Sequence, residues 1–137
     1  MKIITPKIYL ECNLIFDNDI SMNEITKEVG FVPTSFKDKK DQRKSPFKDD
    51  KLEAFWSIAT NKIETFYLEE VTKEMTKIIK PYLERIKATV MKYNGVVDFL
   101  VVPDFHSTEA PALNFNREFL EIINYLNATV QIDMYID

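Results

Sequence analysis

Apolar and polar side chains alternate through Thr129-Val130-Gln131-Ile132-Asp133-Met134-Tyr135-Ile136. A period of two residues is that of a β-strand with one buried face. We expect the even-numbered side chains of this stretch to face a core. The side chains of Gln131, Asp133 and Tyr135 then face away from that core. The stretch therefore predicts a β-sheet with one open face.

Three further strands are predicted upstream of this stretch. Residues 8–16 alternate in the same way and place Tyr9, Glu11 and Asn13 opposite their apolar side. Residues 96–102 are partly apolar on both faces, with Asp98 among them, which is typical of an interior strand. Residues 54–61 contain aromatic and branched side chains that favour a shorter strand.

Segments with the helical spacing of apolar side chains lie between these predicted strands. Ser21 and Glu24 form a capping-box pattern at the start of a short helix. A longer helical pattern runs over residues 66–93, where Pro81 is expected to cause a kink. Asn116 fits the N-cap of a last helix. The two glycines of the chain, Gly30 and Gly95, follow the first two patterns, where left-handed capping residues are expected.

Together these elements predict one α+β domain over residues 1–137. The order β-α-β-α-β-α-β suggests a two-layer sandwich of about four strands. We expect a mostly antiparallel or mixed sheet, with the helices packed on one face. A long lysine-rich loop is predicted at about residues 35–53 because this polar stretch has no sustained period.

Composition excludes several classes of function. With only two glycines, the chain lacks the glycine-rich loops of dinucleotide-binding and Walker-type proteins. Its net charge of −4 and the aspartates among the lysines of residues 37–51 argue against nucleic-acid binding. A single cysteine fits a reducing compartment, and no apolar run approaches a membrane span. We therefore expect a cytoplasmic protein without a cofactor and without a membrane partner.

Two isolated residues are candidates for chemistry, and both have a simpler structural interpretation. His106 is the only histidine and is flanked by Asp104 and Glu109, but the usual zinc spacing is missing. A solvated loop histidine is therefore favoured. Cys12 alternates with Ile8, Leu10 and Leu14, so it is expected to be a buried apolar side chain and not a nucleophile. The sequence predicts neither a catalytic residue nor a metal ligand.

The outward-facing strand positions are the candidate binding site. They are Tyr9, Glu11, Asn13, Asp98, Gln131, Asp133 and Tyr135. Such polar residues are also expected on any hydrated sheet face, whereas tyrosines among polar groups are typical of protein contacts. A third interpretation is an acidic centre in which three carboxylates, those of Glu11, Asp98 and Asp133, raise one another's proton affinity.

Several segments resemble one protein family along nearly the whole chain. They include Gly30-Phe31-Val32-Pro33-Thr34, Phe55-Trp56-Ser57-Ile58 and the closing stretch of residues 130–136. These segments are similar to those of the bacterial domain of unknown function family 4279. A longer lysine-rich insertion between Thr34 and Trp56 departs from the family pattern. The resemblance implies a bacterial cytosolic protein, and it transfers no catalytic residue because the family has no assigned activity.

The sequence favours a non-enzymatic protein-interaction module, with an immunity or inhibitor-like protein as an example. A small acidic domain without a catalytic motif is suited to binding through shape and charge. The alternative is a small-molecule-binding or hydrolytic enzyme with its acidic centre on the open sheet face. A homodimer formed through that face is also open.

Overall fold

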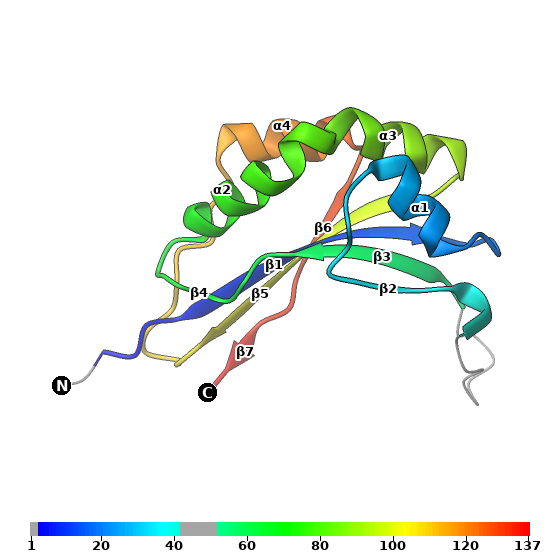
Figure 1. Ribbon diagram of the computed structural model, residues 1–137. Helices are drawn as coiled ribbons and strands as arrows, with labels where there is room; N and C mark the ends of the chain where they lie inside the picture. Colours follow the sequence, from blue (N-terminus) through cyan, green and yellow to red (C-terminus); the bar gives the residue numbers. More distant parts are fainter. Residues whose placement is uncertain (1–2, 42–51) are drawn as a thin grey trace.

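Four α-helices lie on one side of a seven-stranded mixed sheet in the computed structural model, which describes residues 3–41 and 52–137 (Figure 1). The predicted α+β class is confirmed, whereas the predicted number of four strands is wrong. The strands are β1 (Lys7–Phe16), β2 (Ser35–Lys37), β3 (Ala54–Ala59), β4 (Ile63–Glu64), β5 (Val96–Phe105), β6 (Thr129–Ile132) and β7 (Tyr135–Ile136). The helices are α1 (Met22–Val29), α2 (Leu68–Ile79), α3 (Leu83–Lys92) and α4 (Arg117–Tyr125), with 3-10 turns η1 (Lys39–Asp41) and η2 (Lys80–Tyr82).

The main path of the sheet runs in the order β2-β3-β1-β5-β6. Strand β1 pairs antiparallel with β3, β4 and β5, whereas β6 and β7 run parallel to β5. The sheet is therefore mixed. The expected interior strand at residues 96–102 is β5, which continues to Phe105.

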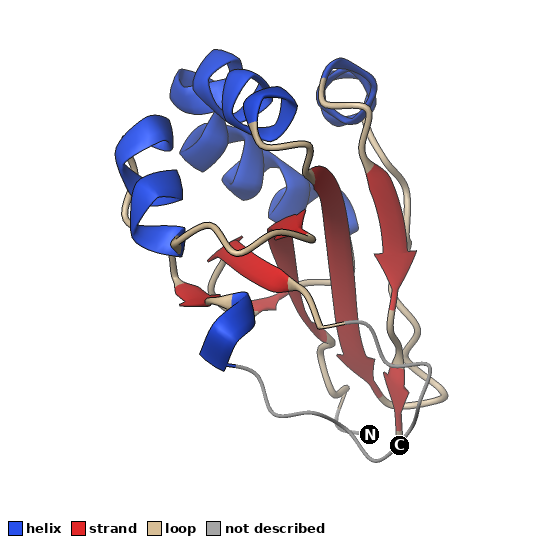
Figure 2. Cartoon of the chain, turned by 90° about the vertical axis from the view of Figure 1, so that its right-hand side faces the viewer, coloured by secondary structure: helices blue, strands red, loops and turns tan. Residues whose placement is uncertain are grey.

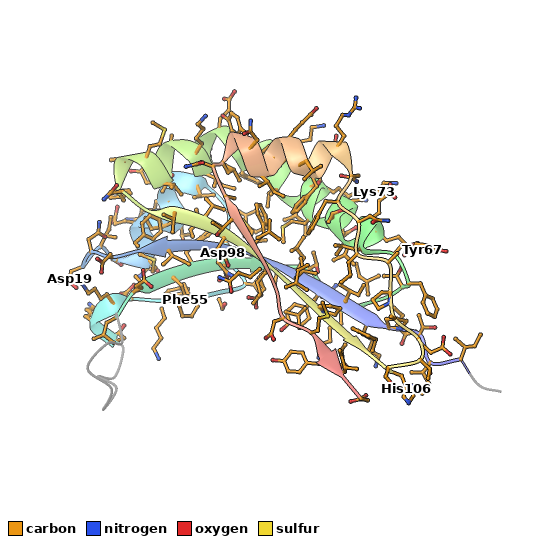
Figure 3. The ribbon with its side chains drawn as sticks, turned by 180° about the vertical axis from the view of Figure 1, so that it is seen from behind. Asp19, Phe55, Tyr67, Lys73, Asp98 and His106 are labelled. Carbon is orange, nitrogen blue, oxygen red and sulfur yellow. The ribbon has the colours of Figure 1, made fainter. Side chains whose placement is uncertain are left out.

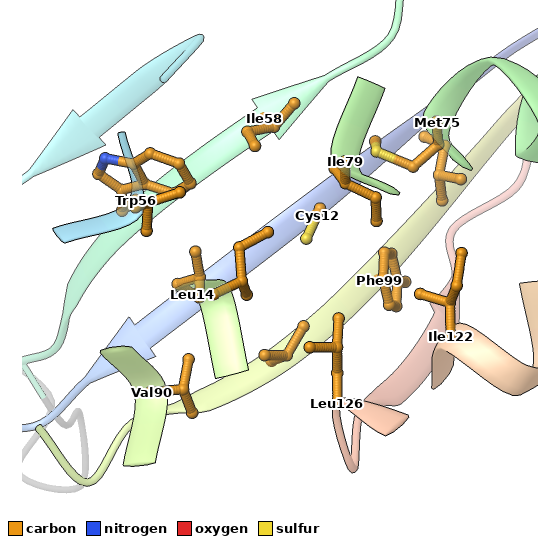
Figure 4. Packing of buried hydrophobic residues seen from close by; sticks show 14 of the residues in the cluster. Cys12, Leu14, Trp56, Ile58, Met75, Ile79, Val90, Phe99, Ile122 and Leu126 are labelled. Carbon is orange, nitrogen blue, oxygen red and sulfur yellow. The ribbon is translucent and has the colours of Figure 1, made fainter. Parts of the chain in front are cut away.

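The core lies between the sheet and the helices. Every even-numbered side chain of β1 from Ile8 to Phe16 is buried, as the alternation predicts. Trp56 of β3, Phe99 of β5 and Met75 of α2 are fully buried in the same layer (Figure 4). The indole N–H of Trp56 donates to Thr26 Oγ1 at 2.9 Å, so the one polar atom of this side chain is bonded.

Local sequence signals set the ends of α1 and the break before α3. Ser21 Oγ accepts from the backbone N–H of Asn23 at 3.3 Å, and Gly30 closes the helix at φ 79°. The expected interruption at Pro81 is the 3-10 turn η2 between α2 and α3. A proline removes a backbone donor from a helix, so the chain makes a tighter turn there.

Gly95 does not act as the expected left-handed cap. Asn94 takes that conformation, with φ 54°. Gly95 is instead required by close packing, because an added Cβ would lie 2.5 Å from Cε1 of Phe16 and 2.9 Å from the carbonyl oxygen of Ile15. Asparagine tolerates the left-handed region, which leaves the glycine free for the contact with β1.

The closing stretch forms two strands instead of one. Residues 133 and 134 separate β6 from β7, although both strands keep the same sequence offset to β5. Asp133 N donates to Val101 O, and Asp137 N donates to Phe105 O. Because every second residue of a strand points its backbone groups to the same side, the backbone nitrogen of Pro103 also faces β6 and β7. Because proline has no N–H, the ladder loses one bond there and the strand is interrupted.

The predicted burial of this stretch is also wrong. Its alternation gives the correct side of the sheet, since Val130 pairs with Phe99 and Ile132 with Val101. However, the apolar side chains beyond Val130 stay exposed: Ile132 by 41%, Met134 by 49% and Ile136 by 57%. Figure 2 shows β7 beyond the reach of the helix layer, so no helix covers this end of the edge.

The loop predicted at about residues 35–53 begins with regular structure. Strand β2 extends the sheet through Ser35, Phe36 and Lys37, and η1 follows it. Short exposed strands such as β2 carry too few residues for a period to be recognised in the sequence. Residues 42–51 of the predicted loop lie outside the described residues.

Candidate functional site

Strand register places five of the seven predicted site residues in adjoining positions on the face opposite the helices. Asn13 lies opposite Asp98, and Glu11 lies opposite Leu100, which in turn faces Gln131 on β6. Tyr9 lies opposite Val102. Directly opposed residues project from the same face of a sheet, so these side chains share one open surface.

A polar row crosses this surface from one edge to the other. Successive cross-strand pairs join Ser35, Ser57, Asn13, Asp98 and Thr129. The Ser57 hydroxyl donates to Asn13 Oδ1, and Thr129 Oγ1 donates to Asp98 Oδ1 at 2.6 Å. Ser57 and Thr129 are members of the row that sequence reasoning missed. Their position in the strands was visible in the sequence, but their neighbours depend on register.

Asp98 belongs to the structure of the sheet more than to its surface. It lies beside β6 near the centre of the sheet and is only 6% exposed (Figure 3). Besides the bond from Thr129, Gln131 Nε2 donates to the same carboxylate oxygen at 3.4 Å. A buried carboxylate needs such donors to offset its lost hydration. We therefore assign Asp98 a role in joining β6 to β5.

A second group, which we call the acidic patch, consists of Tyr9, Glu11, Asp133 and Tyr135. The Tyr135 hydroxyl donates to Asp133 Oδ2 at 3.2 Å. The pKa of the Tyr9 phenol is raised by partial burial and by the nearby Glu11, Tyr135 and Asp133. The negative charge of Asp133 likewise raises the pKa of the Tyr135 phenol. The patch thus combines two neutral phenols with two carboxylates.

The carboxylates of the open face form no ion pair with a basic side chain among the described residues. The five ion pairs among the described residues involve acids that lie elsewhere: Glu24, Asp17, Glu69, Glu118 and Glu28. Glu11 instead accepts a long hydrogen bond of 3.5 Å from Asn13 Nδ2. The acidic patch therefore keeps its charge available to another molecule.

A small hollow adjoins the acidic patch. It has a volume of about 220 Å³ and is lined by Lys7, Tyr9, Lys62, Val102, Asp104 and Tyr135. The Lys62 ammonium lies 5.9 Å from the centroid of the Tyr9 ring. The hollow thus places a cation and an aromatic face next to the carboxylates, and both signs of charge are present at this end of the surface.

The residues considered for metal or nucleophilic chemistry have other surroundings. In residues 3–41 and 52–137 no three histidine, cysteine, aspartate or glutamate side chains are grouped to hold a metal ion. His106 Nδ1 lies 2.8 Å from Thr108 Oγ1 in its own turn. Burial, followed by the charge of Asp98, raises the pKa of the Cys12 thiol to about 12. Cys12 is fully buried, as its alternation with apolar residues predicts.

Two of the segments that carry the family resemblance, residues 30–34 and 55–58, meet in space near β2 and β3, whereas the closing stretch lies at the other edge of the sheet. The backbone N–H of Thr34 donates to Ser57 O at 2.7 Å, and Ala59 N donates to Thr34 Oγ1 at 2.9 Å. Trp56 bonds to Thr26 of α1 from the other side of β3. These contacts give the segments a role in holding the start of β2 against the sheet.

Comparison with known proteins agrees with the resemblance. A family model described as "Domain of unknown function (DUF4279)" matches residues 11–137. No curated protein and no solved structure matches the chain. Within the described residues, no helix has the length and apolar character required to cross a membrane.

Proposed function

Because the chain belongs to the DUF4279 family, whose description names no activity, we propose from the site itself that this protein is a protein-interaction module. Its open sheet face would bind a partner that presents lysine or arginine side chains. The observation that carries this proposal is the acidic patch, whose carboxylates have no basic partner among the described residues. An immunity or inhibitor-like role in the cytosol is one form of this function.

The side chains of the patch suit a protein contact. Tyr135 is 55% exposed, and Tyr9 is half-buried against β5. Tyrosine offers a large contact area at a small entropic cost and keeps a hydroxyl for hydrogen bonding. The carboxylates of Glu11 and Asp133 beside these rings favour a cationic partner and exclude an acidic one. Charge therefore selects the partner while the rings supply contact area.

The proposal is tested with two charge reversals of equal size. Glu11→Lys reverses one carboxylate of the acidic patch, whereas Glu74→Lys changes an exposed position on α2, on the helix side. Both variants have the same net charge. A partner captured from the source cell should bind the wild type and E74K, and should bind E11K about a hundredfold more weakly, because like charges then meet at the contact.

The affinity for the wild type should also fall as salt is added. The proposal is refuted if the captured protein binds E11K as tightly as E74K, or if neither the wild type nor E74K retains any protein. Glu11 lies on β1, away from the β6–β7 edge, so the test leaves that edge unchanged.

The alternative is a small-molecule-binding or hydrolytic enzyme with Glu11, Asp98 and Asp133 as its acidic centre. The hollow beside Tyr9 is the observation that favours a small ligand. We rank this function second because the three carboxylates have separate partners, namely Asn13, Thr129 with Gln131, and Tyr135. A ligand screen by thermal shift, repeated with Tyr9→Ala, would detect a molecule bound in the hollow.

A further inference from the structure

The edge formed by β6 and β7 has unpaired backbone groups. Asp133 N and Asp137 N donate inward to carbonyl oxygens of β5. Successive residues of a strand point their backbone groups to opposite sides. The N–H and C=O groups of Ile132, Met134 and Ile136 therefore point outward, where no segment of residues 3–41 or 52–137 pairs with them.

The same three residues expose apolar side chains. Ile132, Met134 and Ile136 are 41%, 49% and 57% exposed, on the side of the sheet that elsewhere holds the core. Proteins usually protect a free edge with lysine, proline or an inward-pointing charge. Residues 129–136 contain no lysine, proline or glycine. The edge thus has the properties of a strand that is covered by another molecule.

The sequence of this edge is complementary to itself. Met134 has an isoleucine two positions away on each side, at Ile132 and Ile136. An antiparallel copy centred on Met134 places Ile132 opposite Ile136 of the second copy, and Met134 opposite its own equivalent. All three residues carry the outward backbone groups, so each opposed pair can exchange two hydrogen bonds.

The other face of the edge is complementary as well. In the same register Asp133 lies opposite Tyr135 of the second copy. Within one chain the Tyr135 hydroxyl already donates to Asp133 Oδ2. A phenol opposite a carboxylate is a favourable cross-strand pair, whereas two opposed carboxylates would repel each other. The register that joins the apolar side chains therefore also separates the negative charges.

From these observations we propose that two copies of this chain form a symmetric dimer by antiparallel pairing of their β6–β7 edges about Met134. The pairing joins the two sheets into one and covers the exposed isoleucines. A two-fold interface requires one surface to fit itself, and this edge meets that requirement residue by residue. The dimer engages Asp133 and Tyr135, which also belong to the acidic patch. Its test uses the isolated protein and needs no partner, so the failure of one proposal can be told from the failure of the other.

The test is the mass of the purified chain in solution. Light scattering during size-exclusion chromatography should give the wild type twice the chain mass of 16.1 kDa. Met134→Lys puts two like charges opposite each other on the symmetry axis and removes two apolar contacts, so dimerisation should weaken about a hundredfold. The matched control is Met91→Lys, at a methionine that is 73% exposed on α3, which should remain dimeric.

A second pair of variants tests the register. Ile132→Asp alone should give a monomer. Combining it with Ile136→Lys should restore the dimer, because the introduced charges of opposite sign then face each other twice. Circular dichroism checks that each variant is folded.

A monomeric wild type overturns the proposal. So does a dimer that survives M134K, which would point to the β2 edge instead. A double variant that stays monomeric while folded refutes the register centred on Met134.

Discussion

Replacing Asp98 tests whether this carboxylate belongs to the sheet or to the binding surface. If Asp98 joins β6 to β5, Asp98→Ala should lower stability, because Thr129 and Gln131 lose their hydrogen-bond acceptor. Asp98→Asn should lower stability less, since the amide oxygen still accepts the hydrogen bond from Thr129. A contact residue on the surface would instead affect partner binding and leave stability unchanged.

The size of the stability loss follows from the lengths of the two hydrogen bonds to Asp98. A hydrogen bond to a charged acceptor contributes about 1.5 to 3 kcal/mol to stability. The bond from Thr129 is short, at 2.6 Å, whereas the 3.4 Å contact from Gln131 adds little. Thr129 and Gln131 are exposed, so water replaces the lost acceptor and no buried donor is left. The loss from Asp98→Ala is therefore about 2 kcal/mol, or about 7 °C in Tm for a domain of this length.

Urea denaturation followed by circular dichroism measures this loss, and Asp104→Ala is the matched control. Asp104 lies on the same strand and the same face but is exposed, so its removal should change stability by less than about 0.5 kcal/mol. A double-mutant cycle with Thr129→Val should give a coupling energy of about 1 to 2 kcal/mol. If Asp98→Ala and Asp104→Ala unfold at the same urea concentration, Asp98 does not hold β6 and our assignment is refuted.

Three further predictions concern single residues. Cys12 should resist iodoacetamide at pH 8 until denaturant is added, as its raised pKa of about 12 and full burial require, and rapid labelling of the folded protein would contradict this. Gly95→Ala should lower the free energy of unfolding by about 1 to 3 kcal/mol, since the new methyl meets the Phe16 ring, and an unchanged urea midpoint would disprove the close contact. The Tyr9 phenol should ionise above pH 10.0 in an absorbance titration. The contribution of Tyr9 to stability is therefore present below that pH and is lost as the pH rises through the pKa of the folded state. Glu11→Gln should bring the pKa of Tyr9 closer to 10.0, and a titration without a raised pKa would contradict the acidic patch.

The candidate site was predictable in its composition but not in its organisation. Alternation assigned Tyr9, Glu11, Asn13, Asp98 and Gln131 to outward positions, and strand register places them on one face. It did not show that Asp98 bonds to its β6 neighbours and thereby differs from the other carboxylates. That difference depends on which strands lie side by side, and side-chain period contains no information about neighbours.

The sequence by itself determined features that depend on a few consecutive residues. Ser21 and Gly30 set the ends of α1, Pro81 set the break between α2 and α3, and the period of two in β1 set which side chains enter the core. In each case the cause is local backbone geometry or a missing donor within the element itself.

Only the tertiary structure decided the features that depend on distant residues. The missing N–H of Pro103, on the neighbouring strand β5, interrupts the closing strand. The Phe16 ring reserves Gly95 for packing and leaves the left-handed turn to Asn94. Ile132, Met134 and Ile136 face the side that their alternation predicts, yet no helix reaches them. A pattern of alternation states which way a side chain points, whereas its burial depends on whether a second layer covers that face.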